Sequence, residues 1–250
     1  MIRNLLLGWL CLVVGITHVS AGAYIFDDAN AKFKSGDHAG AVAVYEKILE
    51  NGSPDAAVYY NLGNSYQNLK QYGPAILAYE RARLLTPRDP DLAANLSLAR
   101  KAATAFEGSE TGPKWLAVLS YLSRNEWSYL VVAGVLFLGA ITLLYGAVRL
   151  PRQVVKWASA AGGLAVLSII AGSTALYLRR GESERGVVLK ENAAIRLSPF
   201  DGAESLGTPG LGKTVHLGVK NGGYQYVEIP GASLRGWMAE AEVERIEKDP

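Results

Sequence analysis

The sequence has very few of the residues that most enzymes and metal-binding proteins use for chemistry. Its 250 residues include one cysteine, three histidines and two methionines. Cys11 and His18 both lie in the N-terminal segment, so a chain cleaved after this segment would have no thiol for a disulfide or for redox chemistry. His38 and His216 have no cysteine or second histidine at the spacing of a metal site. We therefore expect no metal and no cofactor, and we expect His216 to be a surface residue.

The sequence also lacks an excess of charge of either sign. Its formal net charge is +2, and basic residues cluster only beside apolar segments, which argues against nucleic acid as a partner. We find no phosphate-binding glycine loop followed by lysine, no nucleophile elbow and no paired histidines with a nearby carboxylate. These absences predict a protein that is not an enzyme.

The first 23 residues are typical of a secretory signal peptide. One basic residue in MIRN is followed by the apolar segment LLLGWLCLVVGI and then by THVSAGA, which ends in small residues. Ala21-Gly22-Ala23 fits the A-x-A pattern of a cleavage site, so we expect residues 1–23 to be removed after Ala23 or after Ala21. The alternative is an uncleaved anchor, although the apolar segment is short for a membrane span, which needs about 20 residues.

An internal repeat with a period of 34 residues begins after this segment. Pairs of residues at this separation match repeatedly: Asn30/Asn64, Ala41/Ala75, Tyr45/Tyr79, Asn61/Asn95 and Leu62/Leu96. Repeats of this length are stacked helical hairpins, since one hairpin cannot bury its apolar face alone. We expect residues 24–107 to form two such units and the first helix of a third, which caps the stack.

The second unit resembles the tetratricopeptide repeat closely. It has Leu62, Gly63 and Tyr66 on its first helix and Ala75 and Tyr79 on its second. Leu62 and Tyr66 recur at helical spacing and belong to one buried stripe. Gly63 and Ala75 are small because the two antiparallel helices must approach each other closely there. The resemblance implies an all-α tetratricopeptide-repeat array, a fold that offers a concave surface for binding.

A series of polar residues should line this concave surface. Regularly placed asparagines could hydrogen-bond the backbone of an extended peptide or of a bound helix from a protein partner. Alternatively they serve the packing of the array, because Asn-Leu-Gly-Asn belongs to the consensus of the repeat. The predicted partner-binding groove consists of Asn30, Lys34, Asn61, Asn64, Gln67, Asn68 and Asn95.

Two long segments without charge follow the repeats. Residues 127–148 and 157–178 contain no Asp, Glu, Lys, Arg or His, and each is long enough to cross the hydrocarbon core as a helix. We expect a transmembrane hairpin of two helices, and the lack of ionisable groups argues against a transporter. Residues 108–126 should form a linker and a short helix, which lies on the membrane surface or packs on the repeats.

The charges between the two segments predict their orientation. The short connection 149–156 carries Arg149, Arg152 and Lys156 and no acidic residue, and short basic loops usually face the cytoplasm. The repeats and the C-terminal module then lie on the other side, in agreement with the export signal. We expect a protein of the bacterial inner membrane with both of these modules in the periplasm.

Residues 186–247 have a different periodicity. Short β-type segments alternate with turn-rich segments, and five strands in so short a module predict a small all-β barrel. The dipeptide Gly236-Trp237 resembles bacterial SH3-like domains, which usually end in a Gly-Trp-apolar strand followed by a short helical turn. The candidate surface contacts are Tyr224, Tyr226 and Trp237, although Trp237 could instead fill the core of the barrel.

The order of these modules resembles that of the BatE-like repeat proteins of the bacterial aerotolerance (Bat) operons. The resemblance covers nearly the whole chain and rests on this order and on the Asn-Leu-Gly-Asn and Gly-Trp motifs. It implies an inner-membrane scaffold that works beside von Willebrand A-domain membrane proteins and, indirectly, a MoxR-type ATPase. The alternative is an envelope module that binds peptidoglycan through the SH3-like domain and uses the repeats only as a spacer.

Overall fold

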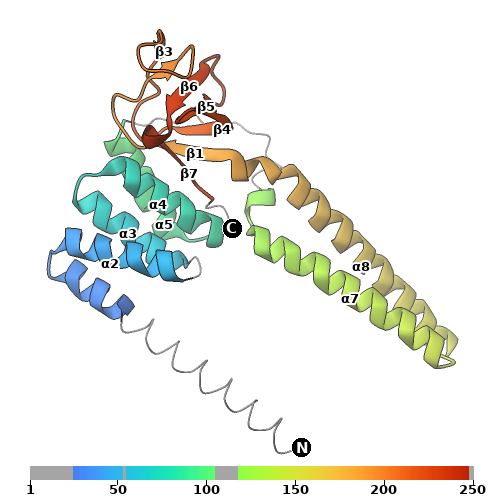
Figure 1. The fold of residues 1–250 in the computed structure, drawn as a ribbon. Coiled ribbons are helices and arrows are strands. Elements are labelled where there is room, and N and C mark those ends of the chain that lie inside the picture. Colours follow the sequence, from blue (N-terminus) through green and yellow to red (C-terminus); the bar gives the residue numbers. More distant parts are fainter. Residues whose placement is uncertain (1–24, 53–54, 105–117, 248–250) are drawn as a thin grey trace, which may run out of the picture.

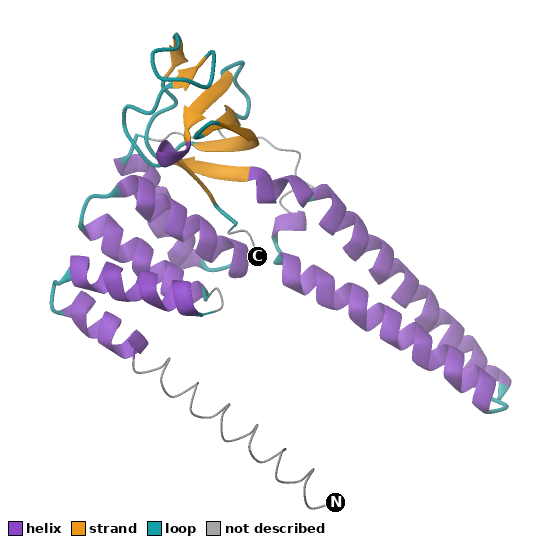
Figure 2. Cartoon of the chain, in the orientation of Figure 1, coloured by secondary structure: helices purple, strands orange, loops and turns teal. Residues whose placement is uncertain are grey.

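The computed structural model describes residues 25–52, 55–104 and 118–247 (Figure 1). A helix over residues 25–34 is followed by α2 (His38–Asn51), α3 (Ala56–Asn68), α4 (Tyr72–Leu85) and α5 (Pro90–Ala102), which form the repeat part. The long helices α7 (Arg124–Ala147) and α8 (Arg152–Leu178) come next. Residues 185–247 form a mainly antiparallel-strand part, the β module (Figure 2).

The β module contains seven strands and the second of two short 3-10 helices. In chain order the elements are η1 (Arg180–Glu184), β1 (Arg185–Val188), β2 (Ile195–Arg196), β3 (Ser205–Gly207), β4 (Thr214–Asn221), β5 (Tyr224–Glu228), β6 (Arg235–Ala239), η2 (Glu240–Glu242) and β7 (Val243–Arg245). The predicted signal peptide, the linker and residues 114–117 at the start of the predicted surface helix lie outside the described residues.

The repeat helices begin where the sequence supplies a capping side chain. The carboxylates of Asp37, Asp55 and Asp89 accept hydrogen bonds from backbone N–H groups in the first turns of α2, α3 and α5. These groups have no partner within the helix. Pro90 occupies the first position of α5, where its missing N–H is not needed. The predicted all-α repeat region is thus confirmed for the described residues.

The two helices of the second repeat approach each other closely at Gly63, for the reason that the sequence indicates. A Cβ atom at this position would lie only 2.5 Å from Cε1 of Tyr79 on the facing helix. Tyr79 and Ala75 are fully buried, so the ring has no free space into which it can move. A glycine on one helix therefore makes room for the tyrosine of the other.

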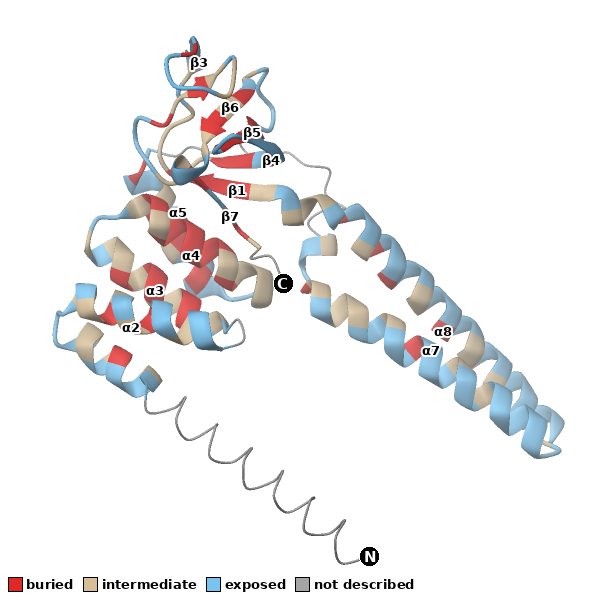
Figure 3. Cartoon of the chain, in the orientation of Figure 1, coloured by how far each residue is buried: buried red, intermediate tan, exposed pale blue. Residues whose placement is uncertain are grey.

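Helices α7 and α8 form a pair that projects away from the other parts (Figure 1). By length and composition, both are apolar enough to cross a membrane, and most of their side chains are exposed (Figure 3). The two helices contact each other through small residues. A Cβ atom on Gly134 would lie 2.8 Å from Ile169 Cγ1, and one on Gly172 would lie 2.6 Å from Val131 Cγ2.

Helix α7 begins earlier than residue 127, where the apolar segment begins. The Ser123 side chain accepts a hydrogen bond from the Glu126 N–H, and the Glu126 carboxylate accepts one from the Ser123 N–H. This capping box sets the first helical residue at Arg124. Only residues 118–120 of the preceding segment are helical among those described.

The connection between α7 and α8 is also shorter than expected. Arg152 and Lys156 lie within α8, and Pro151 is the residue before its first turn. The predicted loop of residues 149–156 therefore shrinks to 148–151. Proline is compatible with a helix start, because its backbone has no N–H to leave unpaired.

The strands of the β module form one antiparallel sheet in the order β3-β2-β6-β5-β4-β1-β7. The five predicted strands are present, and β3 and β7 are additional. β7 follows η2, a short helical turn at the position that the sequence suggests. Strands β3 and β7 are opposite edges in the described residues, so the sheet is not closed there and the predicted barrel is not confirmed. The ladder between β2 and β3 is short, because these strands have only two and three residues.

The repeats and the β module share one hydrophobic core. Val187 of β1 and Ile246 after β7 are buried in the same cluster as Ile76 and Tyr79 of α4. The β module also has a core of its own, which includes Val188, Ile195, Val215, Val227 and Met238. The two modules are therefore packed together.

Candidate functional site

The first part of the predicted groove is a hydrogen-bonded unit of three side chains. Asn30 Oδ1 accepts a hydrogen bond of 2.6 Å from the Tyr45 hydroxyl and one of 3.0 Å from Asn61 Nδ2. Asn30 and Tyr45 belong to the two helices of the first repeat, and Asn61 belongs to the second repeat. The unit therefore joins the helices of one repeat to the first helix of the next.

The same unit recurs one repeat later. Asn64 Oδ1 accepts hydrogen bonds of 2.7 Å from the Tyr79 hydroxyl and 3.0 Å from Asn95 Nδ2. Asn95 Nδ2 also donates to the Tyr60 hydroxyl at 2.9 Å, and Gln67 Oε1 lies 3.2 Å from the Tyr79 hydroxyl as a longer, second acceptor. The matches of asparagine and tyrosine at the repeat period thus have a structural cause.

The two tyrosines of these units, Tyr45 and Tyr79, are fully buried. Burial raises the pKa of both hydroxyls, because a phenolate ion would lose its hydration inside the protein. The hydroxyls therefore keep their protons and remain donors to the asparagines. A buried donor without its acceptor would cost about 1–3 kcal/mol, which ties both asparagines to the stability of the array.

Each asparagine still has one half of its amide available. Among the described residues, Asn30 Nδ2 and Asn64 Nδ2 have no hydrogen-bond partner, nor do Asn61 Oδ1 and Asn95 Oδ1. All four side chains are partly exposed. The two alternatives for these residues are therefore compatible: one half of each amide serves packing, and the other half can bind the backbone of a ligand.

A shallow hollow of about 430 Å³ lies beside the second unit. The predicted residues Gln67 and Asn68 line it, together with Lys70, Tyr72, Leu98 and Ala102. Leu98 of α5 is 56% exposed, so the hollow combines amide groups with an apolar contact. Lys34 is exposed at the position equivalent to Asn68 in the first repeat.

The β module presents a row of side chains on its outer face. Tyr226 of β5 is paired with Trp237 of β6, and Trp237 is paired with Arg196 of β2. Directly paired residues point to the same face of a sheet. The Tyr226 and Trp237 rings meet edge to face, with 5.4 Å between their centroids and an interplanar angle of 80°. All three side chains are partly exposed.

The structure corrects two expectations about this face. Trp237 does not fill the core of the module, because the buried residues Val227 and Met238 point to the opposite face. Tyr224 is not a surface contact, because it is 7% exposed and its hydroxyl donates a hydrogen bond to Asp201. His216 is exposed, as expected.

A buried carboxylate connects the repeats to the β module. Glu80 of α4 is 1% exposed and pairs with Arg83 at 2.7 Å, with Arg100 of α5, and with Arg185 of β1 at 4.0 Å. Burial alone would raise the pKa of Glu80, but the three guanidinium groups together hold it below its usual range. The sequence offers only the Glu80/Arg83 spacing as a signal, because the other partners are distant in the chain.

The next residue of α4 makes a second connection. Arg81 Nε donates to the backbone oxygen of Ile246 at 3.0 Å. Its terminal NH2 group donates to the backbone oxygen of Arg245 at 2.9 Å and to the Glu244 carboxylate at 2.7 Å. One side chain thus holds Glu244, Arg245 and Ile246 against the repeats, at a junction that sequence analysis alone misses.

The base of the helical pair is tied to both other parts. Arg88, in the turn before α5, pairs with Glu126 of α7 at 2.6 Å, and Arg124 of α7 pairs with Glu247 of the β module at 2.6 Å. Arg179, at the end of α8, donates to the backbone oxygens of Leu119 and Leu122 at 3.0 and 2.6 Å. These contacts position the repeats, the β module and the start of the hairpin relative to one another.

Comparison with known proteins identifies one part of this assembly. Residues 56–89 match the family model of the tetratricopeptide repeat. They include α3, α4 and the Tyr79–Asn64 hydrogen bond. A search of curated proteins gives no match to the chain. The tetratricopeptide repeat is a protein-interaction module, so its presence supports a role as a scaffold that binds protein partners.

Proposed function

We propose that this protein is a non-enzymatic scaffold, anchored in the bacterial inner membrane, that holds a protein partner in the groove of its tetratricopeptide repeats. The observation that carries the proposal is the asparagine series of the groove. Its packing bonds leave Asn30 Nδ2, Asn64 Nδ2, Asn61 Oδ1 and Asn95 Oδ1 unpaired within the described residues. Donors and acceptors in this alternation match the backbone of an extended segment or of a helix end.

The hollow beside Asn68 extends this surface with an apolar contact. Leu98 is 56% exposed there, and burial of such a side chain by a partner would contribute about 1–2 kcal/mol. The expected partner is a segment that offers backbone groups to the asparagines and an apolar side chain to the hollow. Following the resemblance to Bat aerotolerance proteins, the proposed partners are von Willebrand A-domain membrane proteins, and indirectly a MoxR-type ATPase.

The membrane location and orientation are part of the same proposal. Two adjacent helices of sufficient length and apolar composition and a connection with Arg149 and Arg152 favour a hairpin whose tip faces the cytoplasm. Alkaline phosphatase fused after Glu247 should therefore be active in the periplasm of a bacterial host. If the fusion after Glu247 is expressed but inactive, and a fusion at Arg149 is active, the orientation is the reverse of the proposed one.

Recovery of partners from native membranes tests the binding proposal. The charge-adding variant Asn68→Glu with Leu98→Glu changes two exposed groove residues without touching the asparagine–tyrosine bonds. We expect the wild-type chain to recover a von Willebrand A-domain protein in mild detergent, and we expect this variant to recover at least about tenfold less, a loss of 1.4 kcal/mol or more. The quantity measured is partner per scaffold by mass spectrometry.

A matched control adds the same charge elsewhere. Ser97 and Ser233 are both exposed and neither lines the hollow, so Ser97→Glu with Ser233→Glu should recover the partner like the wild type. Equal recovery by the groove variant and this control would show that the groove is not the binding site.

A second candidate function has its own observation. The half-buried pair Tyr226 and Trp237, next to Arg196, is an aromatic surface that could stack on an envelope polymer such as peptidoglycan. If this SH3-like surface carries the function, Trp237→Ala in the same experiment removes wall fragments from the recovered material. The Asn68→Glu, Leu98→Glu variant then recovers them unchanged.

A further inference from the structure

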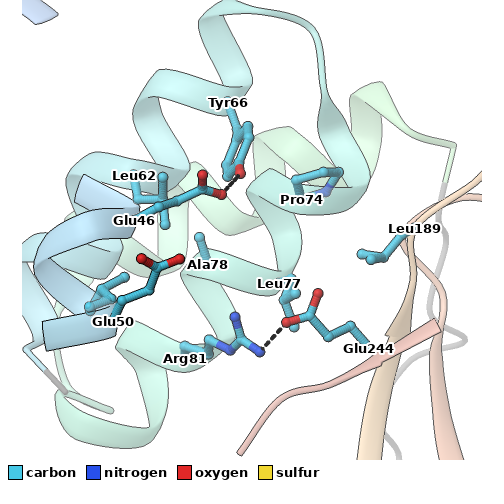
Figure 4. A pocket seen from close by; sticks show the side chains of 11 residues that line it. Glu46, Glu50, Leu62, Tyr66, Pro74, Leu77, Ala78, Arg81, Leu189 and Glu244 are labelled. Carbon is cyan, nitrogen blue, oxygen red and sulfur yellow. Dashed lines mark hydrogen bonds and ion pairs between the residues drawn. The ribbon is translucent and has the colours of Figure 1, made fainter. Parts of the chain in front are cut away.

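A cleft of about 360 Å³ lies between the repeats and the β module (Figure 4). None of the asparagines of the groove lines it. Its apolar lining consists of Leu49, Leu62, Pro74, Leu77, Ala78 and Leu189. Its polar lining consists of Glu46, Glu50, Tyr66, Arg81 and Glu244. Most of these residues belong to α2, α3 and α4, and Leu189 and Glu244 come from the β module. The volume and the mixed lining are typical of a binding site between two modules.

The charges around this cleft are not balanced. Among the described residues, Arg81 is the one basic residue that lines it, and its Nε and NH2 groups donate to Glu244 and to two backbone oxygens of the C-terminal segment. Glu46 accepts a hydrogen bond from the Tyr66 hydroxyl, which brings no positive charge. Glu50 has no hydrogen bond or ion pair with the described residues. Within the described parts of the chain, neither Glu46 nor Glu50 therefore has an ion pair.

The two carboxylates without an ion pair lie next to each other on one helix. Glu46 and Glu50 are four residues apart on α2, so they lie on the same face of the helix. Like charges at this spacing destabilise a helix, and both side chains border the same apolar surface (Figure 4). Both side chains are exposed, so a cation from outside the protein can reach them.

We propose that this cleft binds a cationic side chain, an arginine or a lysine, of a protein segment. The aliphatic stem of such a side chain would lie along the leucines, as long basic side chains commonly do on apolar surfaces. Its charged head would meet Glu46 and Glu50 in charge-assisted hydrogen bonds. The proposal concerns a second site and does not depend on the groove.

Formation of this cleft requires both modules, since Leu189 and Glu244 come from the β module and the remaining residues from the repeats. A ligand in the cleft contacts residues of both modules at once. Its binding therefore stabilises the state in which the two modules are in contact. The cleft therefore couples recognition of a basic segment to the contact between the two modules.

The test uses the 250-residue chain in lipid nanodiscs and a short fluorescent peptide with a single arginine flanked by alanines. Fluorescence anisotropy should detect binding to the wild-type chain, and Glu46→Gln with Glu50→Gln should weaken it at least about tenfold. The matched control is Asp27→Asn with Asp28→Asn, which removes two exposed carboxylates on the first described helix, outside the cleft. This control should bind the peptide within about twofold of wild type, since surface charges far from a site have small effects.

Three results would each overturn the proposal. One is no binding of the arginine peptide up to about 1 mM, the weak limit of specific recognition. Another is equal binding of a peptide with citrulline in place of arginine, because citrulline has the same shape without the charge. The third is competition by spermidine at a lower concentration than the peptide, which would make the site one for small polyamines. The Asn68→Glu, Leu98→Glu groove variant should bind the arginine peptide normally, so failure of the groove leaves this test unaffected.

Discussion

Replacement of Glu80 with glutamine should lower the free energy of unfolding by about 3 kcal/mol, the low end of the range for a broken buried ion pair. The glutamine keeps the shape of the side chain but leaves Arg83, Arg100 and Arg185 without their shared anion. The three guanidinium groups are partly exposed, so water relieves some of the cost. For a chain of this length the loss corresponds to a fall in Tm of about 10 °C, measurable by thermal unfolding in nanodiscs.

The repeat itself provides the control for this substitution. Glu46 occupies the position one repeat before Glu80, but it is exposed. Glu46→Gln should therefore change the free energy of unfolding by less than about 1 kcal/mol, as surface substitutions usually do. Equal shifts in Tm for the two variants would mean that the buried cluster does not stabilise the contact between the modules.

The same residue predicts a pH dependence. The pKa of Glu80 lies below its ordinary value of 4.5 in the folded protein, so the unfolded chain takes up this proton first as the pH falls. The stabilisation is complete above pH 4.5 and is lost as the pH drops through the lower pKa of the folded state. The wild-type Tm should therefore fall more steeply below this pH than that of Glu80→Gln, and parallel curves would contradict the assignment.

Replacement of Gly236 with alanine should destabilise the β module by about 3 kcal/mol, at the upper end of the usual range for overpacking. The added Cβ would lie 2.5 Å from the backbone oxygen of Arg196 and 2.9 Å from Ile195 Cγ2. A backbone atom cannot rotate away as a side chain can, so β2 must separate from β6 and the pairing of Arg196 with Trp237 must break. Hydrogen exchange at the β2 and β6 amides, together with thermal unfolding, measures this effect.

Gly218 on β4 is the matched control for this position. A Cβ there would lie 3.3 Å from the ring of Tyr226, a partly exposed side chain that can shift by a few tenths of an ångström. Gly218→Ala should cost less than about 1 kcal/mol. If the two alanines have equal effects, the close approach of β2 does not explain the glycine before Trp237.

The repeat units could be predicted from the sequence because their contacts are local and periodic. Asn30 with Asn64 and Tyr45 with Tyr79 match at the repeat period, and each asparagine bonds a tyrosine fifteen residues later in the chain. Ser123 and Glu126 are also a local signal, the spacing of a capping box, which moves the helix start ahead of the apolar segment. Local patterns of this kind are visible in one sequence.

The contact between the modules could not be predicted in the same way. Glu80 meets Arg185, and Arg81 meets Glu244, across more than a hundred positions of the chain, and no periodicity relates these residues. The cleft with Glu46 and Glu50 depends on this contact, so it could not be predicted from the sequence either. Trp237 illustrates a related limit: strand alternation places it on one face, but only the burial of Val227 and Met238 on the opposite face shows that its own face is the outer one.

The core shared by the repeats and the β module has a mechanical consequence. Ile76 and Val187 are buried in one cluster, and Arg88 and Arg124 connect both modules to the first turn of α7. Within the described residues, the repeats, the β module and the base of the paired helices are therefore joined by a shared core and by ion pairs. A sideways force on a segment held by the repeats would be transmitted to the start of α7 as a torque. The protein would then act as a lever fixed at the start of its two long helices.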